Sequence, residues 1–181
     1  MSQSDLADQQ AAQAVVNHHS ELAATLTAHV TRLVDAADAG TPTRVWAVRD
    51  QLATWLHAEL LPHAYAEEAS LYPVAAQLPG GKLLVDGMLG EHRVIAALVA
   101  ELEGAASPVL AAATAYALHA VFASHLAKEN DLIVPLLVAA DDVSLAGLLD
   151  GMHDIIGAET GAAADGCGGT CGCGDTLARS T

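Results

Sequence analysis

Two pairs of histidine and glutamate recur in this sequence with the same spacing. His63 precedes Glu67 by four residues, and His125 precedes Glu129 by the same interval further along the chain. In an α-helix, residues four apart lie on one face, so each pair would place an imidazole nitrogen beside a carboxylate oxygen. Two such helices facing each other could enclose a pair of metal ions.

Other histidines interrupt apolar stripes of helical period. His19 lies among apolar residues in the segment 5–38, and His92 does so in the segment 82–103. A buried carboxylate costs several kcal/mol unless it is paired or bound to metal, so two glutamates on core faces need shared partners. We therefore predict one metal site built from six side chains: His19, His63, Glu67, His92, His125 and Glu129.

Two adjacent histidines, His18 and His19, are candidates for the metal ligand on the first helix. His18 and His19 point about 100° apart, so they cannot both lie on the same seam. The heptad phase favours His19, and His18 is either an additional metal ligand or a solvent-facing neighbour. His57 and His119 also recur, but each lies six residues before a ligand histidine, a rotation of roughly 120°. We expect both to be flanking residues.

Glu68 and Tyr72 lie near the predicted ligands in the sequence, and their roles are considered separately. Glu68 follows Glu67 directly, so it either faces solvent or supports a ligand from outside the site. Tyr72 is expected to pack in the core rather than take part in chemistry.

The ligand types narrow the choice of metal. Imidazole and carboxylate with open positions suit iron, manganese or zinc, whereas calcium and magnesium prefer oxygen ligands. Because a carboxylate has two oxygens, Glu67 and Glu129 could each bridge two cations. The expected count is two metal ions, with positions left for an exogenous ligand.

Hydrophobic periodicity, Gly and Pro divide the chain into helices. We expect long helices over residues 5–38, 43–77, 82–103 and 108–140, and a shorter one over 143–156. Short connections favour an all-α, up-down-up-down four-helix bundle with a short C-terminal helix and a disordered tail. The inward residues expected on the first helix include Ala12, Val16 and Ala23, and those on the fourth include Leu132 and Leu136.

The ends of the chain differ in composition from its middle. We assign residues 1–10 to a flexible N-terminus, 11–158 to the bundle and 159–181 to a Gly/Cys-rich flexible tail. The tail contains Cys167, Cys171 and Cys173. Three thiolates are one short of a closed tetrahedral site, so the alternatives are a disordered end, a transient metal site or a redox thiol pair.

Charge and hydropathy exclude some partners. Lys and Arg number 7 against 22 Asp and Glu, and the net charge of −15 would repel nucleic acid and anionic lipid. The N-terminal residues lack the basic start and apolar core of a signal peptide, and no uninterrupted apolar run approaches the ~20 residues of a membrane span. We expect a cytoplasmic protein that binds neither nucleic acid nor membrane.

The order of these motifs resembles the hemerythrin-like family of HHE cation-binding domains. The matching pieces are NHHSEL, PHAYAEEASLYP, GEHRVIAALV and HLAKENDLIVPLL, spread over about residues 11 to 158. The resemblance implies a non-haem diiron site in a four-helix bundle, used for binding or sensing oxygen or nitric oxide, for sensing iron, or for repairing iron centres. Oxygen-carrying members have a second His four residues after the third-helix ligand, where this chain has Ala96.

Three functions are compatible with these residues. The first is a diiron protein that binds or senses oxygen, nitric oxide or peroxide, with any catalysis being redox chemistry at the metal. The second is an iron-dependent regulatory or interaction module whose protein partner the sequence does not identify. The third is a structural zinc bundle.

Overall fold

The computed structural model describes residues 3–152, and these are almost entirely helical. Residues 145–152 form a helical segment after the last named helix. The named helices are α1 (Gln3–Asp38), α2 (Pro42–Trp55), the π-helical η1 (Leu56–Leu60), α3 (Leu61–Ala69), α4 (Leu71–Ala75), α5 (Gly81–Glu103), α6 (Pro108–Lys128), the π-helical η2 (Glu129–Ile133) and α7 (Val134–Val138). The predicted all-α class is confirmed.

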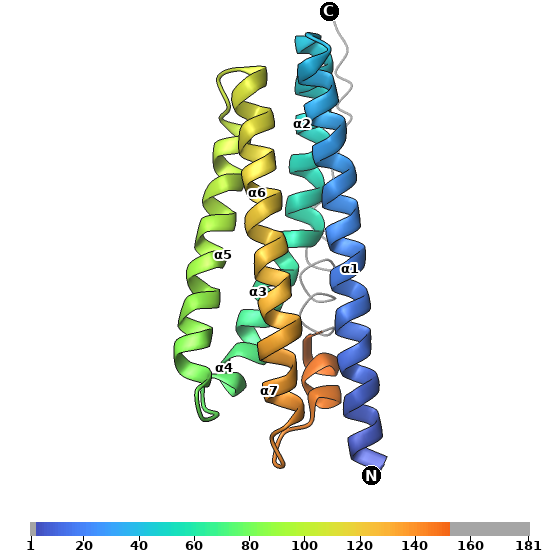
Figure 1. Cartoon of the computed structure of the whole chain (residues 1–181), viewed down its shortest axis with the longest axis vertical. Coiled ribbons are helices and arrows are strands. Elements are labelled where there is room, and N and C mark those ends of the chain that lie inside the picture. Colours follow the sequence, from blue (N-terminus) through green and yellow to red (C-terminus); the bar gives the residue numbers. More distant parts are fainter. Residues whose placement is uncertain (1–2, 153–181) are drawn as a thin grey trace, which may run out of the picture.

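Long helical runs lie side by side along the longest axis of the molecule (Figure 1). Helix α1 packs against α2 and α6, and α5 packs against α6 and α2. The second and fourth predicted helices are each divided into shorter segments, so the structure contains more helices than the four long ones and one short one expected.

Each interruption in these runs precedes a proline. Segment η1 ends two residues before Pro62, η2 ends two residues before Pro135, and α3 ends at Ala69, ahead of Pro73. A proline cannot donate the i→i−4 hydrogen bond, and its ring crowds the carbonyl four residues earlier. A wider or broken turn relieves that crowding, and π-turns of this kind are frequent at functional sites.

Segment η2 changes which residues face the core after Glu129. Leu132 is 47% exposed and Leu136 is only half-buried, whereas Ile133 and Leu137 are buried. The prediction of Leu132 on the inner face was therefore wrong, whereas Leu136 packs, half-buried, against the core cluster. A π-turn contains one residue more than an α-turn, so it advances the inner face by one position.

The inner face of α1 also differs in detail from the expected stripe. Ala11, Val15 and Leu22 are buried, while the predicted Ala12, Val16 and Ala23 are half-buried. Both sets lie on neighbouring rows of the same helix face, because residues three and four apart share a face. The expected face was correct, and its centre is shifted by one residue.

The structure describes only part of the two chain ends. Helix α1 begins at Gln3, so residues 3–10, which we assigned to a flexible N-terminus, are helical. The described part of the predicted C-terminal helix is 145–152. The tail 159–181, with Cys167, Cys171 and Cys173, lies outside the described residues.

One helical run among residues 3–152 meets the length and composition criteria for a membrane span. It covers Pro108–Val138 and has a mean hydropathy of 1.4 in its most apolar window. The run carries buried His125 and Glu129 and packs against α1 and α5. A core helix of a soluble protein passes the same test, so this is weak evidence for a membrane.

Candidate metal centre

A layer of polar side chains divides the core of the molecule. One apolar cluster includes Leu26, Val99 and Phe122 on one side, and a second includes Met88 and Leu137 on the other. Along each long run, the predicted ligands lie where the chain passes from one cluster to the other. The six side chains that make up the layer are His19, His63, Glu67, His92, His125 and Glu129, and they are the buried polar residues of the described part.

The six side chains come from α1, α3, α5, α6 and η2, with His63 and Glu67 both on α3, and they form two groups that could each hold an ion. Within each group the candidate ligand atoms lie within 4.8 Å of one another. Glu67 belongs to both groups, so its two oxygens lie at the boundary between two possible ion positions. The smaller group is His19, His63 and Glu67, and the larger is Glu67, His92, His125 and Glu129.

In the smaller group, two imidazoles converge on one carboxylate oxygen. Nε2 of His63 lies 3.0 Å from Oε1 of Glu67, and Nε2 of His19 lies 3.4 Å from the same oxygen. His19 Nε2 is also 3.7 Å from Oε2 of Glu129. His19 therefore contacts both carboxylates, and the two groups are continuous.

In the larger group, two imidazole nitrogens face each other. Nε2 of His92 and Nε2 of His125 are 3.0 Å apart. His92 Nε2 is 3.6 Å from Oε2 of Glu67, and His125 Nε2 is 3.5 Å from Oε2 of Glu129. Four candidate ligand atoms thus face one small volume.

Hydrogen bonds outside the layer determine which nitrogen of three histidines faces inward. His19 Nδ1 donates to Oδ1 of Asn130 at 2.7 Å, and His92 Nδ1 donates to Oε1 of Glu68 at 2.7 Å. With the proton on Nδ1, the lone pair of each imidazole is on Nε2, which faces the carboxylates. Metal-bound histidines in proteins are oriented in the same manner.

His125 is oriented by a chain of charged groups. Its Nδ1 donates to Oε2 of Glu91 at 3.2 Å, and Lys128 donates to the other oxygen of Glu91. Thus His92 Nε2 and His125 Nε2 face each other with lone pairs rather than with hydrogens. A cation between them would remove that repulsion, because both nitrogens could donate electron density to it.

Several atoms of the layer have no hydrogen-bond partner among the described residues. They are His19 Nε2, both nitrogens of His63, Glu67 Oε2 and Glu129 Oε2. Unsatisfied polar atoms are rare in protein interiors, and each one costs roughly 1–3 kcal/mol. The donor set of imidazole nitrogen and carboxylate oxygen is suited to a transition metal, so the residues present fit metal ions.

The pKa values of the two buried carboxylates are shifted in opposite directions. Burial raises the pKa of Glu67, but His63 and His19 beside it hold the net pKa well below its usual range. Burial and the negative charge of Glu67 raise the pKa of Glu129 well above its usual range. Two buried carboxylates side by side resist double ionisation unless cations are present.

Burial also keeps an imidazole of this layer neutral. Desolvation, together with neighbouring His92, lowers the pKa of His125 to about 4. A neutral imidazole is the form that binds metal.

Tyr72 is a part of the site that the sequence did not reveal. It is 1% exposed, and its hydroxyl donates to Oε1 of Glu129 at 2.5 Å. In an uninterrupted helix Tyr72 would be rotated about 140° from Glu67, away from the site. The break at Ser70, between α3 and α4, changes that phase and allows Tyr72 to reach Glu129.

Glu91, Lys128 and Asn130 were also missed. Each of the three adjoins a predicted ligand in the sequence, Glu91 next to His92 and the other two next to Glu129, and adjacency was the available signal. Glu68, for which support of a ligand was one of two alternatives, does hydrogen-bond His92.

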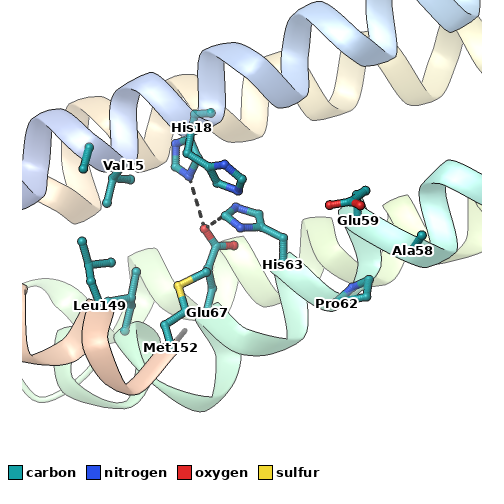
Figure 2. Close-up of a pocket in the computed structure, with 12 residues that line it drawn as sticks. Val15, His18, Ala58, Glu59, Pro62, His63, Glu67, Leu149 and Met152 are labelled. Atoms are coloured by element: carbon teal, nitrogen blue, oxygen red, sulfur yellow. Dashed lines mark ion pairs between the residues drawn. The ribbon is translucent and has the colours of Figure 1, made fainter. Parts of the chain in front are cut away.

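The remaining histidines considered lie outside the two groups. His18 is exposed, and its ring packs edge-on against that of His63, with centroids 4.9 Å apart. His57 pairs with Glu103, and His119 with Thr27, as expected of flanking residues. Figure 2 shows the surroundings of His63 and Glu67, where dashed lines mark the ion pairs made by Glu67.

Comparison with known proteins bears on this layer. The family model of the hemerythrin HHE cation-binding domain matches residues 10–137, a stretch that contains all six side chains of the layer. No curated protein and no solved structure matches the chain. Because the matched stretch is more than half of the sequence, the chain belongs to the hemerythrin HHE cation-binding domain family.

Proposed function

We propose that the protein binds two iron ions in this layer and binds or senses a small ligand there, either oxygen, nitric oxide or peroxide. The observation that carries the proposal is that Glu67 belongs to both groups of potential ligand atoms. A carboxylate shared in this way suits a bridge between two cations. Four histidines and Glu129 would complete the set, which leaves positions free for the ligand.

Bound iron would supply ligand coordination and one-electron redox chemistry. The chain's own residues hold and orient the site. Asn130, Glu68 and Glu91 keep the lone pairs of their histidines turned inward. Tyr72 holds one oxygen of Glu129. The two apolar clusters on either side keep bulk water from the layer.

The finer architecture and location are part of the same proposal. We infer that α1, the run α2–η1–α3, α5 and the run α6–η2–α7 form an up-down-up-down bundle, supported by the short connections between them. The net charge of −15 supports a protein that binds no nucleic acid, and we infer that it acts in the cytoplasm. The buried ionisable groups on the apolar run Pro108–Val138 support a location away from membrane.

His18 remains a candidate additional ligand because its ring contacts that of His63. The family's oxygen carriers have a fifth histidine where this chain has Ala96. A sensing or scavenging role therefore suits this chain at least as well as reversible oxygen carriage.

A second candidate is an iron-dependent regulatory or interaction module. The layer joins α1, α3, α5, α6 and η2, so occupied metal positions would tie most of the fold together. Metal occupancy could then control the conformation of a surface to which a protein partner binds. This candidate predicts iron binding with a large change in thermal stability but no spectral response to small ligands.

Anaerobic purification with iron quantitation tests both candidates. We expect two irons per chain, and optical bands that change when oxygen, nitric oxide or peroxide is added. Tightly bound zinc without a spectral response would contradict the proposal. The double variant Glu67→Ala/Glu129→Ala should take up no metal, while Glu101→Ala, on an exposed part of α5, should behave as the unaltered protein.

A further inference from the structure

A cavity of about 280 Å³ borders the smaller group of ligands. Its walls come from α1, from the run η1–α3–α4 and from the helical segment 145–152 (Figure 2). His19, His63 and Glu67 line it on the metal side. The cavity therefore leads from the surface of the molecule to one of the two candidate ion positions.

The volume of this cavity exceeds the needs of a diatomic ligand. A dry protein cavity of about 150 Å³ can hold benzene, and a water molecule occupies only about 30 Å³ in the liquid. The cavity here is large enough for an organic molecule of benzene size or somewhat larger. A site used by diatomic molecules alone does not require so much space.

The lining of the cavity is largely apolar. Val15, Leu71, Leu149 and Met152 contribute large side chains, and Leu149 and Met152 come from the segment 145–152. This lining suits an apolar body. The acidic side chain of Glu59, which is not one of the proposed metal ligands, and a net charge of −15 for the whole chain disfavour an anion.

We propose that this cavity binds a neutral organic molecule of about six to ten non-hydrogen atoms with a largely apolar body, such as a ketone, aldehyde or alcohol. The apolar body contacts the leucines, Val15 and Met152. The bound molecule then lies beside the metal position formed by His19, His63 and Glu67.

Calorimetric titration of the full-length, metal-loaded protein with cyclohexanone tests this inference. We expect saturable binding, and at least tenfold weaker binding of cyclohexanecarboxylate, which has a similar body but a charge. Ala14 and Ala58 line the cavity from opposite walls, and both are exposed, so Ala14→Phe and Ala58→Phe should fold and fill it. Each should weaken cyclohexanone binding at least tenfold, whereas Ala24→Phe, on an exposed part of α1 outside the cavity, should not.

The result separates this inference from the proposed function on which it rests. Metal content is measured before each titration. A protein that holds two metal ions but gives no saturable heat with cyclohexanone, or binds it equally well in the Phe variants, overturns the cavity assignment alone. Equal affinity for the ketone and the carboxylate overturns the preference for a neutral ligand. A protein without metal overturns the proposed function, and titration of the same sample still shows whether the cavity binds cyclohexanone.

Discussion

The hydroxyl of Tyr72 donates a hydrogen bond to Oε1 of Glu129 at 2.5 Å, and both side chains are buried. The same hydroxyl lies 3.4 Å from Nε2 of His92. Tyr72 therefore connects a carboxylate on η2 with an imidazole on α5, although it lies on α4. Its role is to position Glu129, because the other oxygen of that carboxylate is left free for a cation.

Replacing Tyr72 by Phe should weaken metal binding without unfolding the protein. The variant keeps the ring but removes the donor, so Oε1 of Glu129 is no longer held. Loss of such a supporting hydrogen bond typically lowers metal affinity by about 10- to 100-fold. Competition with a chelator measures the affinity. Tyr65→Phe is the matched control because Tyr65 is 55% exposed. Equal affinities in the two variants would show that Tyr72 only packs.

Single substitutions should remove metal in steps. His63 belongs to the smaller group alone, so His63→Ala should leave about one ion per chain bound by the larger group. Glu67 belongs to both groups, so Glu67→Ala should lose both ions. Metal content by mass spectrometry gives the count, and circular dichroism shows whether each variant remains helical. If the two variants retain the same amount of metal, Glu67 is not a shared ligand.

The burial of the six polar side chains in one layer could be predicted because it depends on helical period alone. His92 lies in an unbroken helix, and apolar residues on its face before and after it, such as Val85 and Val99, are also buried. The layer at His63 and Glu67 depends on one turn of α3, which is also regular. Over such short distances, a period of 3.6 residues places a side chain on the correct face.

Predictions failed where the helical period changes. Ile133 replaces Leu132 on the inner face because η2 inserts a residue into the turn after Glu129. Tyr72 reaches the site because the chain breaks at Ser70. Proline indicated that both runs would be disturbed, but it does not specify whether a helix kinks, widens or ends. Hydrogen bonds between helices, such as His92 to Glu68, depend on packing that single-helix patterns do not contain.

Asp8 holds the segment 145–152 against α1, and removing it should loosen that segment. Oδ1 of Asp8 accepts from the backbone N–H of Ala146 at 3.0 Å and from the hydroxyl of Ser144 at 3.2 Å. Both donors lie at the start of the segment, where backbone N–H groups lack helical partners. Asp8→Ala should cost about 1 kcal/mol, equivalent to roughly fivefold faster amide exchange of the segment.

Hydrogen–deuterium exchange by mass spectrometry measures the effect on that segment. Asp35→Ala, an exposed aspartate elsewhere on α1, should leave the exchange of 145–152 unchanged. If Asp8→Ala has no more effect than Asp35→Ala, then packing of Leu149 and Met152 is sufficient to hold the segment.

Gly81 should be intolerant of any side chain because the last residue of α4, Ala75, lies directly against it. A Cβ on Gly81 would lie 1.8 Å from the carbonyl oxygen of Ala75. Gly81→Ala must displace backbone, so we expect a loss of about 3 kcal/mol or more in the free energy of unfolding. Gly87 lies at an exposed position of α5 with nothing within 4 Å of its Cβ position. Gly87→Ala should instead gain about 0.5–1 kcal/mol, since alanine favours a helix. Urea denaturation compares the two, and equal stability of both variants would show that the α4–α5 connection adapts freely.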